Sequence, residues 1–181
     1  MGPSDLLKPV IERNFSGTIH FGRVAIKPGK PTTFATIPFK SENAEETVSK
    51  PVFALPGNPA SALVTFYVFV LPALRKLSGY AQSSLHLPRV RVQVQTPMRP
   101  DPRVEFHRAI VKVRTNGEQL EGGSGMVLEA WSTGGQRSSR AASLQGANAL
   151  VIVPSSKDRE KGYEKGEWAE AILIGELEVS V

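Results

Sequence analysis

The tetrapeptide Pro56-Gly57-Asn58-Pro59 restricts the fold of this chain more than any other feature of its sequence. The residues 52–55 before it are a short apolar run, and apolar residues continue after it to about Leu77. Asn58 suits the N-cap of a helix, and Pro59 suits the first helical position because its missing N–H would have no partner there. This order predicts a strand, a tight turn and a helix buried on several sides, which is an α/β pattern.

The other elements of the N-terminal half follow from periodicity and from turn residues. Apolar positions after Asp5 predict a helix, and residues 18–26 and 33–39 predict strands. Two prolines and a glycine make residues 27–31 a turn, and residues 40–50 are polar enough for a surface loop. Pro72 should kink the long helix and Gly79 should end it.

The second half of the chain has the pattern of a small all-β unit. Short runs with alternating or apolar character are separated by Gly, Pro and Asn, and they predict strands at residues 90–94, 108–113, 126–131, 149–153 and 168–177. We therefore expect a boundary near residue 84, with one domain at residues 1–84 and a second at residues 85–181.

Composition limits the classes of protein to consider. The chain has 181 residues, 40% of them hydrophobic, which is enough for one sizeable core or two small ones. It has no cysteine, which excludes disulfides and thiolate metal sites. No signal peptide is evident and the apolar stretch 60–74 is short for a membrane span, so we expect a cytoplasmic protein without a membrane partner. The net charge of +5 favours anionic ligands.

Four segments carry side chains that could bind an anion, and each also has a plain structural interpretation. The turn at 27–31 holds two lysines, and the helix start at 56–61 offers free backbone N–H groups. Arg103 could bind an oxyanion with two parallel hydrogen bonds, and the loop 132–140 is rich in hydroxyls, glycines and arginines. The structural alternatives are a solvated turn at 27–31 and a capped core helix at 56–61. For the segment with Arg103 the alternative is a strand with a packed His107, and for 132–140 it is an ordinary polar loop.

Taken together, these segments resemble the molybdopterin molybdenumtransferases, a family that includes the E domain of gephyrin. The motifs that carry the resemblance are His20-Phe21-Gly22-Arg23-Val24, Lys27-Pro28-Gly29-Lys30-Pro31, Leu55-Pro56-Gly57-Asn58-Pro59-Ala60-Ser61-Ala62, Glu105-Phe106-His107-Arg108, Ser132-Thr133-Gly134 and Ser138-Ser139-Arg140. The resemblance implies a C-terminal fragment: part of a three-layer, pterin-binding α/β domain whose first strands are missing, followed by a small β-barrel-like domain.

The resemblance also implies a reaction, in which molybdate is inserted into adenylated molybdopterin and AMP is released, with Mg²⁺ as cofactor. Matched positions imply that molybdate is bound by Lys27, Lys30, Pro31, Ser61, Arg103 and Ser138. Gly57, Asn58 and Ser61 would bind the phosphate of the pterin. Asp5 and Lys30 would be the catalytic residues, with Asp5 also supporting the magnesium ion. His107 matches as well, but no catalytic step is assigned to it.

Two other functions stay open at this stage. The chain could be a gephyrin-like scaffold that binds receptor peptides without catalysis, which requires an exposed apolar groove. It could also bind nucleic acid through its positive charge, but aromatic residues are not interleaved with its basic ones, and we expect no nucleic-acid partner. The resemblance implies a homodimer for the full-length protein. Arg137 departs from the family pattern, in which an apolar residue is common.

Overall fold

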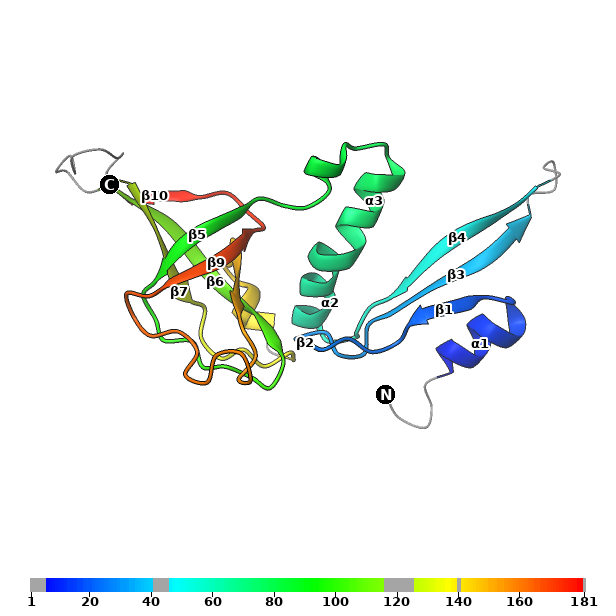
Figure 1. Ribbon diagram of the computed structural model, residues 1–181, viewed down its shortest axis with the longest axis horizontal. Helices are drawn as coiled ribbons and strands as arrows, with labels where there is room; N and C mark the ends of the chain where they lie inside the picture. Colours follow the sequence, from blue (N-terminus) through cyan, green and yellow to red (C-terminus); the bar gives the residue numbers. More distant parts are fainter. Residues whose placement is uncertain (1–5, 41–45, 116–125, 140, 181) are drawn as a thin grey trace.

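The computed structural model describes residues 6–40, 46–115, 126–139 and 141–180. Figure 1 shows three parts in a row: a small sheet with helix α1, a long central helix, and a β-barrel. The short helices η2 (Gln82–Ser84) and η3 (Ala141–Leu144) lie in the connections. The predicted combination of an α/β part with a small β-barrel-like part is confirmed.

The first sheet has three antiparallel strands in the order β1-β3-β4: β1 (Thr18–Phe21), β3 (Thr33–Lys40) and β4 (Thr47–Ala54). The single strand predicted at 18–26 is wrong, because the chain leaves this sheet after Phe21 and forms β2 (Ile26–Lys27) elsewhere. The loop predicted at 40–50 is also wrong in part, since Thr47–Lys50 pair with β3 and lengthen the hairpin. Residues 41–45 lie outside the described part.

Helices contact this sheet from two sides. Helix α1 (Leu7–Asn14) places Ile11 beside Ile37 of β3, where both side chains approach Gly17. Phe34 points to the other face, because side chains alternate along a strand. There Phe34 contacts Phe21, which contacts Phe69 of the central helix. A helix thus contacts each face of the sheet, and the three-layer domain implied by the family resemblance remains a prediction.

The central helix is continuous from Pro59 to Leu77 but contains a wide turn. It consists of α2 (Pro59–Thr65), a π-helical segment η1 (Phe66–Val70) and α3 (Leu71–Leu77). The π-helical turn ends at Val70, two residues before Pro72, whose ring and missing N–H disturb a regular α-helix. It therefore lies where a kink is predicted. The helix ends before Gly79, which has a φ of 82°.

Burial along this helix is lower than predicted. Its buried residues are confined to the first two turns, at Ala60, Ser61, Val64 and Thr65. Leu74 and Leu77 are exposed. By length and composition this 19-residue helix could cross a membrane, but one helix of this kind is weak evidence, because core helices of soluble proteins meet the same criterion.

Five strands close into a barrel. They are β5 (Arg89–Val94), β6 (Val104–Thr115), β7 (Met126–Ser132), β8 (Ala149–Val153) and β9 (Trp168–Leu173). Each pairs with its neighbours in the circuit β6-β7-β5-β9-β8-β6. The last strand predicted at 168–177 ends at Leu173, and β10 (Glu178–Ser180) pairs separately with β6. The core is made of small and branched side chains, including Val92, Val94, Val111, Ala130, Val151 and Ala171.

The barrel and the central helix share an apolar contact, which positions the site. Val64 of α2 packs against Phe106, Leu150 and Ile172 of the barrel. Beside this contact, β2 runs parallel to β6, with Ile26 opposite Val104 and Lys27 opposite Glu105. The domain boundary predicted near residue 84 remains a prediction. Residues from both sides of it pack together in this contact.

Candidate functional site

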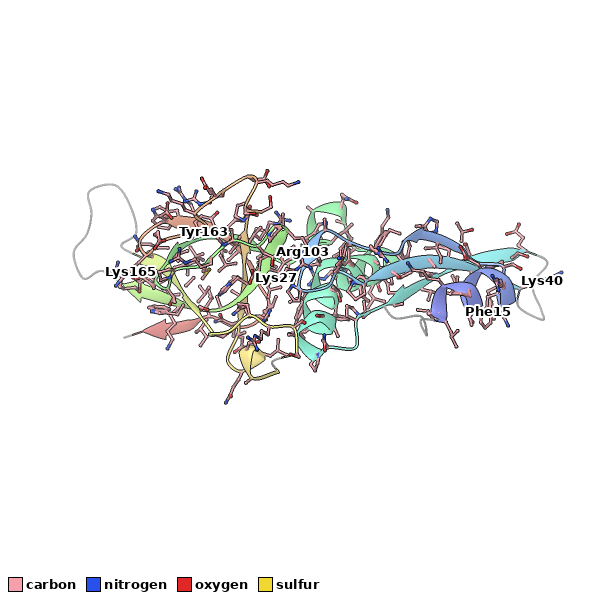
Figure 2. The ribbon with its side chains drawn as sticks, turned by 90° about the horizontal axis from the view of Figure 1, so that it is seen from below. Phe15, Lys27, Lys40, Arg103, Tyr163 and Lys165 are labelled. Atoms are coloured by element: carbon pink, nitrogen blue, oxygen red, sulfur yellow. The ribbon has the colours of Figure 1, made fainter. Side chains whose placement is uncertain are left out.

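A polar cavity lies where the turn after β2, the start of α2 and the barrel meet. It has a volume of about 430 Å³ and is lined by Lys27, Pro28, Gly29, Lys30, Pro31, Pro56, Asn58, Ser61, Arg103, Gln136, Arg137, Ser138 and Ser139. Figure 2 shows Lys27 and Arg103 close together at the junction of the barrel and the central helix. Four segments that are far apart in the sequence therefore form one cavity.

The turn at 27–31 is held by its own backbone and by the central helix. Gly29 has a φ of 121°, which is a backbone conformation that residues other than glycine rarely adopt. Its carbonyl accepts hydrogen bonds from the backbone N–H of Thr32 at 3.0 Å and from the Thr32 hydroxyl at 2.7 Å. A Cβ on Gly29 would lie 2.5 Å from Cγ2 of Thr65. The turn, which contains a cis Lys27–Pro28 bond, is thus packed against α2.

The helix start differs from the predicted cap in one respect that affects the site. Asn58 stands at the N-cap position with an extended backbone, but its side chain makes no capping hydrogen bond. Its Nδ2 instead donates to Oγ of Ser138 at 3.3 Å, across the cavity. Ser61, in the first turn, is 3% exposed and lines the same cavity. The amide therefore joins the helix start to the barrel loop.

Two carboxylates lie behind the cations of the cavity. Lys27 Nζ lies 3.3 Å from Oδ2 of Asp101 and 3.0 Å from Oε2 of Glu105. Arg103 Nε lies 3.0 Å from Oδ1 of Asp101. Lys30 and Arg137 have no ion pair within the described part of the chain. The cavity thus combines two paired cations with two that are available to a ligand.

The surroundings of these carboxylates change their affinity for protons. Burial raises the pKa of Asp101, but hydrogen bonds from Arg103 and the charge of Lys27 outweigh it, so the pKa lies below its ordinary value. Burial likewise raises the pKa of Glu105, and contacts with His107 and Lys27 more than offset that effect. Both groups are therefore ionised at neutral pH.

The loop that follows β7 is fixed to the barrel by Arg108, which is fully buried. Its guanidinium Nε donates to Oγ of Ser143 at 3.0 Å, and its backbone N–H donates to the side chain of Gln136 at 2.8 Å. Its carbonyl accepts the hydroxyl of Thr133 at 3.0 Å. Burial lowers the pKa of Arg108, and the charge of Glu105 partly opposes this. These bonds hold the segment that presents Ser138.

His107 belongs to this support rather than to the cavity lining. Its Nε2 lies 2.7 Å from Oγ of Ser132, and its Nδ1 lies 3.3 Å from Oε1 of Glu105 without hydrogen-bond geometry. The side chain is 8% exposed. The packed structural role that the sequence left open for His107 matches this position.

The structure brings most of the predicted site residues together. Lys27, Lys30, Pro31, Asn58, Ser61, Arg103 and Ser138 all line the cavity. Gly57 is exposed beside it and is not part of the lining. Asp5 lies outside the described residues, so its catalytic and magnesium-binding roles remain predictions. The described residues contain no group of three His, Asp or Glu side chains placed to hold a metal ion.

Sequence reasoning missed the two carboxylates and Gln136. Asp101 and Glu105 are ordinary charged residues in the sequence, and only the parallel pairing of β2 with β6 brings Glu105 opposite Lys27. The alternation of charges in residues 101–105 was the available signal, but it does not indicate which residues these charges contact.

Comparison with known proteins matches both parts of the chain. Residues 1–76 match the family described as "Probable molybdopterin binding domain", and residues 91–174 match the "MoeA C-terminal region (domain IV)". The chain is related to the molybdopterin molybdenumtransferases. The resemblance inferred from its motifs is thereby confirmed.

Three relatives illustrate the range of similarity. The chain is 43% identical to a gephyrin of Dictyostelium discoideum over 188 residues, covering 98% of this chain and 24% of that protein. It is 39% identical to the molybdenum cofactor synthesis protein cinnamon of Drosophila melanogaster, covering 96% of this chain and 26% of that protein. It is 30% identical to a molybdopterin molybdenumtransferase of Haemophilus influenzae, covering 87% of this chain and 34% of that protein. The chain thus spans about a quarter to a third of these relatives.

Proposed function

We propose that this chain acts in molybdenum cofactor synthesis, and that its cavity binds molybdate for insertion into adenylated molybdopterin with release of AMP. The observation that carries the proposal is the convergence of Lys30, Ser61, Arg103 and Ser138 on one polar cavity. The relatives named for this pathway and this transferase activity support it.

The charges of the cavity suit a small dianion. Lys30 and Arg137 carry positive charges without an ion pair in the described structure, so a guest with two negative charges would be neutralised. Hydroxyls of Ser61 and Ser138 can donate to its oxygens. Fixed donors of this kind stabilise an oxyanion because they need no reorganisation when it binds.

The size of the cavity leaves space for a second ligand. A water molecule occupies roughly 30 Å³ in the liquid, so the four oxygens of a tetrahedral oxyanion need roughly 120 Å³. The cavity has a volume of about 430 Å³, so a tetrahedral oxyanion would fill only part of it. The remainder, beside the start of α2, is where the proposal places the phosphate of the pterin, near Asn58 and Ser61.

In this proposal the protein supplies position and charge. The turn and the barrel loop hold the oxyanion next to a ligand that already carries phosphate, and the cations oppose the crowding of negative charge. The dithiolene sulfurs are soft ligands suited to molybdenum. Mg²⁺ bound with help from Asp5, catalysis by Lys30 together with Asp5, a homodimer and a cytoplasmic location are further parts of the proposal.

Molybdate binding to the purified protein tests the site. Isothermal titration calorimetry should show binding by the wild type, and Lys30→Ala and Arg103→Ala should each weaken it at least about tenfold, because each removes a charge-assisted contact. Arg89→Ala is the matched control, since Arg89 pairs with Glu170 on the barrel surface away from the cavity. Unchanged affinity in both cavity variants would show that the site is assigned wrongly.

A second candidate function is peptide binding by a scaffold of the gephyrin type. It is favoured by a hollow on the barrel lined by Arg91, Tyr163 and Trp168, in which Trp168 is 43% exposed and lies under the guanidinium of Arg91. Exposed aromatic residues next to arginine are common in protein interfaces. Peptide capture that depends on Trp168, from a protein that does not bind molybdate, would favour this function.

A further inference from the structure

Asp101 is the point at which the two walls of the cavity are joined. One carboxylate oxygen, Oδ2, lies 3.3 Å from Lys27 Nζ in the turn after β2. The other, Oδ1, accepts hydrogen bonds from Nε of Arg103 at 3.0 Å and from its backbone N–H at 3.1 Å. The guanidinium of Arg103 also donates to the carbonyl of Ile26 at 3.3 Å. A single carboxylate therefore holds one cation from each side.

The position of this carboxylate excludes direct contact with an anionic ligand. Asp101 has a side chain that is 16% exposed and is not part of the cavity lining. A carboxylate facing a dianion would repel it, but both oxygens of Asp101 are directed at cations of the protein. The two cations oppose its negative charge, so its main effect on a ligand passes through Lys27 and Arg103.

Without this carboxylate, Arg103 would have fewer restraints than Lys27. Lys27 keeps a second partner, since Glu105 Oε2 lies 3.0 Å from its Nζ and Glu105 is 2% exposed. Within the described structure, the only other hydrogen bond of the Arg103 side chain is the one to Ile26. Removal of Asp101 should therefore release Arg103 more than it releases Lys27.

We propose that Asp101 is a positioning residue that fixes Arg103, and through Lys27 the turn at 27–31, for oxyanion binding. The role in ligand binding rests on the proposed function, whereas the fixing of Arg103 does not. A guanidinium held in one orientation presents its hydrogen-bond donors to an oxyanion with little loss of conformational entropy.

The first measurement needs no ligand. Phenylglyoxal modifies accessible guanidinium groups, and peptide mass spectrometry gives its rate at each arginine. In Asp101→Ala, Arg103 should react at least about fivefold faster than in the wild type, while Arg89 should be unchanged. Asp101→Asn keeps an acceptor oxygen without the charge, so it should give an intermediate rate and remain folded if the alanine variant does not. Glu170→Gln is the matched control, because it frees Arg89 and not Arg103.

The second measurement is calorimetric titration of the same variants with molybdate. Asp101→Ala should weaken binding about tenfold, Asp101→Asn less, and Glu170→Gln not at all. An unchanged rate at Arg103 in both Asp101 variants overturns the proposal. A faster rate with unchanged or tighter molybdate binding overturns the role in ligand binding, because loss of the negative charge by itself would favour an anion. A faster rate in a protein whose wild type does not bind molybdate leaves the positioning role standing and overturns the proposed function.

Discussion

The barrel and the first sheet differ in how completely their strands are paired and their apolar side chains are buried. In the barrel each of the five strands has a partner on both sides, and a connected core of side chains is almost completely removed from water. Within the described residues the first sheet has three strands, and its β3–β4 hairpin extends away from the rest of the molecule in Figure 1. Phe39 and Val48 on that hairpin are about half exposed.

This difference shows where the stability of the described structure resides. Closure leaves the barrel few unpaired strand edges, and β2 and β10 add further pairing along β6. The first sheet leaves unpaired edges and exposed apolar side chains within the described residues. The cavity lies between these parts and depends on the contact of α2 with the barrel. Three predictions test this comparison.

The largest effect is expected at Leu150, which is completely buried where the barrel meets α2. Leu150→Ala should lower the free energy of unfolding by about 2–5 kcal/mol, because it leaves a cavity among Val64, Phe106 and Ile172. Urea unfolding followed by circular dichroism measures this change.

The matched control for that substitution is Leu74→Ala in α3, where the leucine is 48% exposed. It should change the free energy of unfolding by less than about 1 kcal/mol. Equal losses at the two positions would contradict the view that the stable core lies on the barrel side of the molecule.

An intermediate effect is expected in the turn that lines the cavity. Gly29→Ala should lower the free energy of unfolding by about 1–3 kcal/mol, because of the φ of 121° and the approach of Cβ to Thr65. Gly57→Ala is the control: its Cβ would meet no atom within 4 Å, so the change should stay within about 0.5 kcal/mol.

A second variant separates the two causes of that loss. Thr65→Ser removes the methyl group that a Cβ on Gly29 would meet, and it keeps the hydroxyl that donates to the carbonyl of Ser61. In the Thr65→Ser background, Gly29→Ala should therefore cost less than in the wild type, and the remaining loss reports the backbone strain. If the loss is the same in both backgrounds, the turn is not packed against α2 as described.

The smallest effect concerns pH. The pKa of Glu105 lies below its ordinary value of 4.5, so the carboxylate stabilises the fold above that pH, and this contribution is lost as the pH falls through the lower pKa of the folded state. Glu105→Gln should therefore be less stable than the wild type at about pH 7, and the difference should shrink towards about pH 3. Urea unfolding across this range measures it.

Glu167 provides the comparison for the pH effect. Its pKa is also lowered, first by the hydrogen bond from the backbone of Glu164 and then by Arg159, but the carboxyl is exposed to solvent. Glu167→Gln should differ little from the wild type at any pH, because water screens an exposed charge. A pH-dependent difference as large as that of Glu105→Gln would mean that burial beside Lys27 is not what matters.

The sequence predicted those elements whose conformation follows from the preferences of their own residues. The start of the central helix lies at Pro59, and β5, β7 and β8 agree closely with the predicted strands. The errors occur where pairing with a distant segment determines the bounds of a strand. Residues 22–25 separate two short strands because β2 pairs with β6, and Thr47–Lys50 join β4 because β3 is long enough to pair with them. Propensity cannot predict such pairings, because they are tertiary contacts.

The same division applies to the site. Turn residues and the motifs of the family identified Lys30, Ser61, Arg103 and Ser138. They did not identify Asp101, and they assigned to Asn58 a capping bond that the structure replaces with a contact to Ser138. A side chain with two possible partners takes the one that the surrounding packing brings within reach.

The sequence by itself determined local backbone geometry: prolines and glycines fix the turn at 27–31 and the helix start at 56–59, since each restricts or extends φ within its own residue. Only the tertiary structure decided which charges are neutralised and which face the cavity. Asn58 and Ser138 are 80 positions apart in the chain, and electrostatic and hydrogen-bonding energies depend on distance in space, which no local pattern contains.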